Sequence, residues 1–256
     1  MAASAFDLSG KVAIVTGGNG GIGLGMARGL AAAGATIVIA ARNAEKSQAA
    51  VAELTKSGAK AVFIATDITD EKALASLADT TLQKFGRIDV LVANAGTTVR
   101  KPPQTISVAE WHTVIDTNLT STLVAAQSVY PAMKDAGGGK IITIGSMMSL
   151  FGASYSPAYA ASKGGVVQLT RSLACAWADD NIQANCVLPG WIDTEMTQGA
   201  RQQVEGLNER VLARTPAKRW GHTRDFAGIA VFLASSASDF VTGTAIPVDG
   251  GYSVMA

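Results

Sequence analysis

Short apolar runs rich in β-branched residues recur along the chain, separated by longer segments whose apolar and polar positions follow a helical period. Apolar runs of this length that end in glycine or polar residues are typical of parallel strands buried on both faces. The pattern predicts strands over residues 11–16, 36–40, 61–65, 89–92, 140–144, 183–188 and 244–248.

The segments between these runs predict helices over residues 24–33, 44–57, 70–85, 108–133, 158–178 and 223–234. Strands that alternate with helices indicate a parallel sheet covered on both faces. We therefore predict an α/β fold, a single doubly wound domain over residues 1–256 with about seven strands. Residues 191–214 are more polar and less periodic, and we interpret them as a substrate lid that contains a helix.

Composition excludes several classes of protein. Of the 256 residues, 48% are hydrophobic and 16% charged, which indicates a globular chain. A net charge of +1 without a basic block does not suggest nucleic-acid binding. No segment has the apolar length of a membrane span, and the N-terminus lacks the features of a signal peptide. We expect a cytoplasmic protein with a small-molecule substrate and no membrane partner.

The cysteines and histidines give no support to a metal site. Cys175 and Cys186 lack metal-ligand spacing, and we interpret both as free core thiols in a reducing cytosol. His112 and His222 are far apart in the sequence and have no candidate ligands near them. We expect no metal.

A glycine-rich turn joins the first predicted strand to the first predicted helix. Glycines at this position let the backbone approach a pyrophosphate, and the helix N-terminus offers free N–H groups. A tight turn without a ligand is the alternative interpretation. The residues that we expect to contact a dinucleotide here are Gly17, Asn19, Gly21, Ile22 and Gly23.

Tyr159 and Lys163 stand four residues apart in a predicted helix and so share one helix face. An adjacent ammonium favours the phenolate form of tyrosine, and such a pair can serve as a general acid or base. Ser146 follows the strand at 140–144, at the sheet edge where open α/β folds bind ligands. Taken alone, the pair is more typical of two unrelated surface side chains.

The set of motifs together resembles the short-chain dehydrogenase/reductase family, from about residue 8 to residue 252. The motifs are TGxxxGxG at 16–23, Asn94-Ala95-Gly96, Asn118, Ser146, Tyr159, Lys163 and Pro189-Gly190. Ala93 stands where many members have asparagine, and no functional position is lost. The resemblance implies a Rossmann-type fold and hydride transfer between a nicotinamide cofactor and an alcohol or ketone.

The resemblance also implies roles for individual residues. Tyr159 would exchange the proton at the reacting oxygen, and Lys163 would lower the pKa of Tyr159 and bind the nicotinamide ribose. Ser146 would bind the substrate oxygen, and Asn118 would hold a water linked to Lys163. The further positions expected to line the cofactor are Asp67 and Ile68 at the adenine, Asn94, Ala95 and Gly96 at the strand edge, and Pro189, Gly190, Ile192 and Thr194 at the carboxamide.

The end of the second strand bears on the choice of cofactor. Ala41 stands where NAD-preferring relatives carry aspartate, and Arg42 and Asn43 follow it. A guanidinium suits the 2′-phosphate of NADP, although Arg42 is also compatible with a solvated strand end. Gly20 stands where many NADP-preferring relatives carry a basic residue. We predict a preference for NADP(H), with NAD(H) as the alternative.

The substrate side of the cleft is less clearly marked. Arg100 follows the Asn94-Ala95-Gly96 motif and suits a carboxylate, and Trp191 opens the predicted lid. Several segments resemble the gluconate 5-dehydrogenase and ketodeoxygluconate dehydrogenase branch, which implies a polyol or sugar-acid substrate and a homotetramer. The alternatives are a 3-oxoacyl thioester reductase and, without catalysis, an NADP-sensing regulator.

Overall fold

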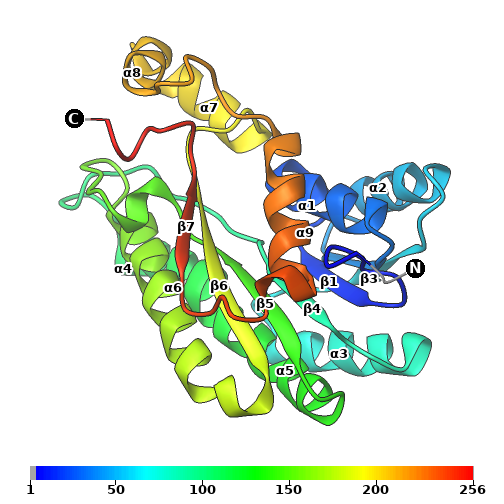
Figure 1. Cartoon of the computed structure of the whole chain (residues 1–256). Helices are drawn as coiled ribbons and strands as arrows, with labels where there is room; N and C mark the ends of the chain where they lie inside the picture. The colour runs from blue at the N-terminus through cyan, green and yellow to red at the C-terminus, as the bar shows by residue number, and fades with distance from the viewer. Residues whose placement is uncertain (1–3, 256) are drawn as a thin grey trace.

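The computed structural model describes residues 4–255, and its strands form one parallel sheet in the order β3-β2-β1-β4-β5-β6-β7 (Figure 1). The strands are β1 (Val12–Thr16), β2 (Thr36–Ala41), β3 (Ala61–Ala65), β4 (Val90–Ala93), β5 (Gly139–Ile144), β6 (Ile182–Pro189) and β7 (Ala245–Val248). This confirms the predicted doubly wound α/β fold. Each predicted strand is present, and neither end of any strand differs from its prediction by more than one residue.

Helices cover both faces of the sheet, as the continuous apolar strands predict. They are α1 (Gly21–Ala32), α2 (Ala44–Lys56), α3 (Glu71–Phe85), α4 (Val108–Ile115), α5 (Ser121–Asp135), α6 (Pro157–Ala176), α7 (Glu195–Gln203), α8 (Leu207–Arg214) and α9 (Ala227–Ala234). Alternate residues of each strand enter different cores. Val15 packs with α1, α2 and α9, whereas its neighbour Ile14 packs with α3, α5 and α6.

The first helix begins at Gly21, three residues earlier than the periodicity predicts. Gly20 is extended, with φ −177° and ψ 175°, and the helix begins directly after it. The glycine turn therefore leads into the helix without a connecting loop. This places the first backbone N–H groups of α1 at the carboxyl end of β1.

The helical region predicted over 108–133 is divided by a π-helical turn, Asp116–Thr120, and continues to Asp135. A π turn inserts an extra residue and changes the direction of the side chains that follow it, and such turns are frequent at functional sites. Asn118 lies in this turn with 1% of its surface exposed.

The predicted lid contains two helices, α7 and α8, instead of one. Gly206, with φ 66°, separates them, and this left-handed conformation favours glycine. Both helices lie beyond the end of the sheet where β6 and β7 finish (Figure 1). A small apolar cluster of Ala200, Leu207, Val211 and Trp220 packs them together.

The expectation that both cysteines are core thiols is wrong for one of them. Cys186 is buried in β6, but Cys175 is exposed because it lies on the outer face of α6. No helix among residues 4–255 has the length and apolar character needed to cross a membrane.

Candidate active site

The carboxyl ends of the parallel strands meet at one edge of the sheet, and the predicted catalytic side chains gather there. β5 ends at Ile144, and Ser146 begins the next turn. α6 begins at Pro157, which suits the first helical position because its missing N–H would have no partner there. Tyr159 is thus in the first turn of α6, and a pocket of about 450 Å³ opens beside it and Ser146.

Lys163 lies behind the pocket, with 4% of its surface exposed. Its Nζ donates a hydrogen bond of 2.7 Å to the carbonyl of Ile144 and lies 5.7 Å from the centre of the Tyr159 ring. The expected pairing of these two residues on one helix face is therefore present. Burial lowers the pKa of Lys163 to about 8, because desolvation disfavours the ammonium.

The pKa of Tyr159 is raised in this structure, opposite to the direction expected from its spacing to Lys163. Burial is the largest cause, and the Ser146 hydroxyl and the charge of Arg100 oppose it only in part. Lys163 directs its ammonium to the Ile144 carbonyl instead of to the phenol oxygen. Proximity along the helix is thus outweighed by desolvation.

Ser146 is held in a short turn, Met147–Ser149, that follows β5. Its Oγ accepts a hydrogen bond from the backbone N–H of Met148 at 3.1 Å, and its own N–H donates to Ser149 Oγ. The Ser149 hydroxyl in turn donates to the Lys163 carbonyl at 2.8 Å. These bonds fasten the serine turn to α6 and fix the hydroxyl on the pocket side.

Asn118 is fully engaged with its neighbours. Its Nδ2 donates to the Thr97 carbonyl and to Ser162 Oγ, and its Oδ1 accepts from the Thr97 N–H at 2.8 Å. A Cβ at Gly96 would lie 3.2 Å from Asn118 Oδ1 and 3.6 Å from Lys163 Nζ. The structure therefore brings Gly96, Asn118 and Lys163 together, as the motifs predict, and their link through water stays a prediction.

The glycine turn fits a bound anion. No side chain caps the N-terminus of α1, and its first turn contains no acidic residue, so the backbone N–H groups remain available to a phosphate. Gly17 and Gly21 have φ of 63° and 53°, which side chains disfavour. Asn94 Nδ2 donates to the carbonyls of Thr16 and Gly17, so Asn94 fixes the backbone at this edge.

Replacing Gly23 with alanine is expected to damage the turn. The added Cβ would lie 2.6 Å from the Gly17 carbonyl oxygen and still closer to Asn94 Nδ2, so the turn must move. We expect a loss of about 1–3 kcal/mol in the free energy of unfolding and at least tenfold weaker cofactor binding. Urea unfolding and fluorescence titration with NADP measure the two effects.

Gly228→Ala is the matched control, because an alanine Cβ on this exposed helical glycine would meet nothing within 4 Å. It should keep cofactor affinity and gain up to about 1 kcal/mol of stability. Unchanged affinity in Gly23→Ala would contradict the assignment of this turn to the cofactor.

Arg42 and Asp67 lie side by side beyond the ends of β2 and β3. The Arg42 side chain is 77% exposed, and its Nη1 is 3.9 Å from Asp67 Oδ2, a distance at which the pairing is weak. Asp67 also caps the following turn through Thr69, and this lowers the pKa of the carboxyl. Asn43 accepts from the Lys46 N–H and caps α2.

The segment after β6 connects the sheet to the lid. Gly190 approaches the Asp249 backbone so closely that a Cβ would lie 2.6 Å from its Cα. Ile192 pairs with Gly221 in an isolated bridge, and Thr194 is the N-cap residue of α7. The Thr194 Cγ2 lies 3.6 Å from the position of a Cβ on Gly21, so this segment returns to the glycine turn.

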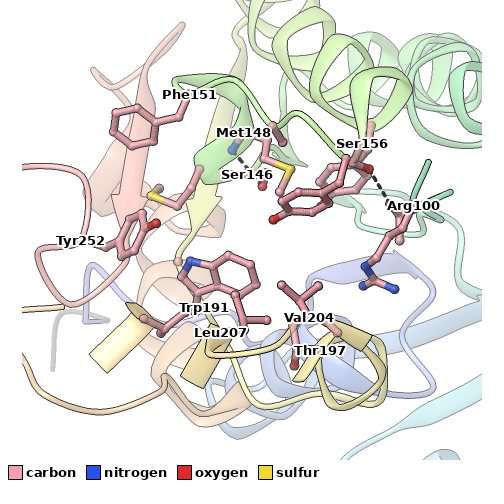
Figure 2. Close-up of a pocket in the computed structure, with 18 of the residues that line it drawn as sticks. Arg100, Ser146, Met148, Phe151, Ser156, Trp191, Thr197, Val204, Leu207 and Tyr252 are labelled. Atoms are coloured by element: carbon pink, nitrogen blue, oxygen red, sulfur yellow. Dashed lines mark hydrogen bonds between the residues drawn. The ribbon is translucent and has the colours of Figure 1, made fainter. Parts of the chain in front are cut away.

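Trp191 and Arg100, the two tentative substrate residues, face the same pocket from opposite sides (Figure 2). The Trp191 indole packs edge-on against Trp220, and its Nε1 is buried without a hydrogen-bond partner among the described residues. A buried donor of this kind normally has a hydrogen-bond partner. Arg100 Nη2 donates to the Met196 carbonyl of α7 at 3.1 Å.

Four large polar residues of the pocket belong to no motif in the sequence. They are Tyr155, Arg210, Arg214 and Tyr252. The Arg214 guanidinium stacks on the rings of Phe151 and Tyr252, 4.7 and 4.6 Å from their centres. Only the helical period of 207–214, which places Arg210 beside Arg214, was visible in the sequence.

Comparisons with known proteins agree with this geometry. The family model described as enoyl-(acyl carrier protein) reductase matches residues 17–253. The 2-dehydro-3-deoxy-D-gluconate 5-dehydrogenase of Formosa agariphila is 40% identical, over 98% of this chain and 96% of that protein.

The chain is also similar to solved structures of gluconate dehydrogenases. A putative gluconate dehydrogenase from Agrobacterium tumefaciens superposes with a TM-score of 0.95 at 41% identity, covering 99% of this chain and 100% of the other. A gluconate 5-dehydrogenase from Burkholderia cenocepacia, solved in complex with NADP and tartrate, has a TM-score of 0.94 at 38% identity and covers 98% of both chains.

Proposed function

The chain belongs to the short-chain dehydrogenase/reductase family, and we propose that it moves a hydride between NADP(H) and a secondary alcohol or ketone of a sugar acid such as gluconate or 5-ketogluconate. The observation that carries the substrate class is the pocket beside Tyr159. Three guanidinium groups, those of Arg100, Arg210 and Arg214, line it among mostly apolar side chains, with no carboxylate among its lining residues. The positive charge of this pocket suits an anion.

The residues at the sheet edge fit the proposed cofactor. The uncapped N-terminus of α1 would receive the pyrophosphate, and Arg42 would contact the 2′-phosphate. Asp67 and Ile68 would line the adenine, and residues 189–194 would hold the carboxamide. The cofactor supplies or accepts the hydride when bound. Relatives of this chain have been crystallised with NADP, which supports the choice.

In the direction of reduction, the Tyr159 hydroxyl gives its proton to the carbonyl oxygen as the hydride arrives at the carbon, so the two additions yield the alcohol. Its raised pKa keeps the phenol protonated, and therefore able to donate, near neutral pH. The Ser146 hydroxyl donates to the same oxygen and stabilises its developing negative charge. Lys163, with a pKa of about 8, is mostly cationic at pH 7 and stabilises the phenolate that remains.

The first experiment is the initial rate of 5-ketogluconate reduction with NADPH, paired with NADH at the same concentration. We expect turnover with NADPH to exceed turnover with NADH by at least tenfold in kcat/KM, because Arg42 offers a phosphate partner and no acidic residue occupies position 41. No rate with either cofactor would refute the sugar-acid substrate and leave the family membership unchanged.

Arg100→Met is expected to weaken recognition of the carboxylate. Loss of a charge-assisted hydrogen bond should raise KM for 5-ketogluconate about tenfold or more and change kcat little. The neutral ketose fructose, tested beside it, should show no such increase. Arg224→Met, an exposed arginine that is not among the pocket lining, is the matched control. Equal effects on both substrates would contradict a carboxylate role.

Two other functions compete with this one. A 3-oxoacyl thioester reductase would act on a neutral ketone at the end of a phosphopantetheine arm, and Arg100 would then have no obvious role. Rapid turnover of an acetoacetyl thioester, with none of 5-ketogluconate, would favour it. A regulator that binds NADP without turnover has no need of Ser146, Tyr159 and Lys163, and any substrate turnover excludes it.

The proposal extends to organisation and location. Residues 1–256 would act as one dinucleotide-binding and catalytic domain, with α7 and α8 as the lid. Two-fold contacts would assemble a homotetramer, for which the exposed Phe240 and Val254 near the last strand offer apolar surface. The cytoplasm would be its location. Light scattering and cell fractionation test the last two points.

A further inference from the structure

Lys46 belongs to the first turn of α2, on a face that the periodicity assigns to solvent, but its side chain reaches back over the glycine turn. A Cβ added to Gly20 would lie 2.9 Å from Lys46 Cε and 3.0 Å from its Nζ. The absence of a side chain at position 20 thus leaves the space that Lys46 fills. The ammonium is held beside the phosphate-binding N-terminus of α1, whose helix begins one residue later.

Hydrogen bonds fix this first turn of α2 to the glycine turn. Asn19 Nδ2 donates to Ser47 Oγ at 3.0 Å, and the Ser47 hydroxyl donates to the Asn43 carbonyl at 2.6 Å. Ser47 is fully buried. The base of the Lys46 side chain therefore has a defined position relative to the turn, and this position does not depend on the lid.

The partner of Lys46 is Glu195, the first residue of α7. Lys46 Nζ donates to both carboxylate oxygens of Glu195, at 2.8 and 2.7 Å. The two side chains are 38% and 82% exposed, and ion pairs this exposed contribute little to stability. Glu195 at a helix N-terminus is also stabilised by the helix dipole, so it can lose its lysine at small cost. Lys46 can therefore exchange the Glu195 carboxylate for another anion.

We propose that Lys46 is a second cationic ligand for the 2′-phosphate of NADP, acting with Arg42, and that it leaves Glu195 when the phosphate binds. The inference rests on the NADP preference of the proposed function. Arg42 and Lys46 flank the cap of α2, and each is paired in this structure with a single exposed carboxylate, Asp67 and Glu195 respectively. A dianionic phosphate is a stronger partner for either cation than one solvated carboxylate.

The exchange makes two substitutions act in opposite directions. Lys46→Gln removes a ligand of the phosphate, whereas Glu195→Gln removes the group that competes with the phosphate for Lys46. If the ion pair only joined α2 to α7, both substitutions would break it and have the same effect. The sign of the difference therefore separates a binding role from a structural one.

The test is calorimetric titration of the intact protein with adenosine 2′,5′-bisphosphate and, in parallel, with 5′-AMP. Both probes omit the nicotinamide, so contacts of residues 189–194 with that ring do not enter. We expect Lys46→Gln to weaken binding of the bisphosphate about tenfold, Glu195→Gln to tighten it about threefold, and neither to change 5′-AMP binding. Thermal melting of each variant establishes that it is folded.

Each other outcome bears on the proposal. A bisphosphate affinity that falls equally in both variants, or in neither, would overturn the role of Lys46 while leaving the NADP preference intact. Wild-type protein that binds both probes equally would overturn the preference and this inference together. Either result leaves the sugar-acid substrate to be decided by its own rate measurement.

Discussion

Tyr159→Phe is expected to lower kcat by about 10³-fold while leaving the affinity for NADP nearly unchanged. The substitution removes only the phenol oxygen, which supplies the proton in the proposed reduction, and general acid–base catalysis of this kind contributes about 10²–10⁴-fold. The ring remains to pack in the first turn of α6, so the fold should not change. Steady-state rates with 5-ketogluconate and a fluorescence titration with NADPH measure the two quantities.

Tyr155→Phe is the matched control for this prediction. Tyr155 lines the same pocket four residues earlier, and burial raises its pKa as it does that of Tyr159. The Lys163 ammonium lies near the ring of Tyr159 on α6, whereas Tyr155 precedes that helix. Loss of the Tyr155 hydroxyl should therefore change kcat less than about tenfold. Comparable losses in the two variants would mean that pocket shape, and not proton transfer, explains the effect.

Lys163→Met is expected to abolish catalysis and to stabilise the fold. Burial depresses the pKa of Lys163 to about 8, so protonating this amine inside the protein costs free energy at pH 7. The shift corresponds to roughly 3 kcal/mol, and loss of the hydrogen bond to the Ile144 carbonyl offsets about 1 kcal/mol of it. We expect the free energy of unfolding to rise by about 2 kcal/mol and kcat to fall at least 10²-fold.

The pH dependence of this stabilisation has a defined sign. Below pH 8 the lysine is protonated in both the folded and the unfolded chain, and the wild type bears the full cost of the buried charge. Between pH 8 and the ordinary lysine pKa of 10.5 the folded protein releases the proton first, so wild-type stability rises. The advantage of Lys163→Met should therefore shrink with increasing pH in that interval.

Urea unfolding of both proteins at pH 7 and pH 9.5 measures this change. Lys140→Met serves as the control for catalysis, because Lys140 is also buried but pairs with Asp239 and is not among the pocket-lining residues. It should retain full kcat. A Lys163→Met protein that is less stable than wild type at pH 7 would contradict the cost assigned to the buried ammonium.

The sequence predicts most of the fold because its strands and helices have strong, uninterrupted periods. The prediction is wrong where contacts between distant elements determine the local backbone. The π turn at Asp116–Thr120 lies inside one continuous helical segment, and the left-handed Gly206 between α7 and α8 looks like any loop glycine. Neither feature changes the local period enough to be visible without the neighbouring elements.

In the candidate site, too, some features follow from the sequence and others depend on the tertiary structure. Ser146, Tyr159 and Lys163 were found from motif spacing, and the structure brings them together because spacing within α6 and the end of β5 determines where they lie. The direction of the Tyr159 pKa shift was not predictable, since it depends on how deeply both side chains are buried. The position of the Lys46 ammonium beside Gly20 is not visible in the sequence, because the helix period places this residue in solvent and a long flexible side chain is free to fold back.

The strand order places the proposed cofactor residues mainly in the N-terminal half of the chain and the substrate pocket mainly in the C-terminal half. The sequences of these two halves can therefore change independently during evolution. Most of the proposed cofactor contacts lie in or just after β1, β2, β3 and β4, whereas the substrate pocket is built mostly by residues after β5. Mutations after residue 146 can thus create a new substrate range while an inherited cofactor preference persists. The Lys46–Glu195 pair spans this division, so drift in the lid at position 195 would retune cofactor choice in the same lineage.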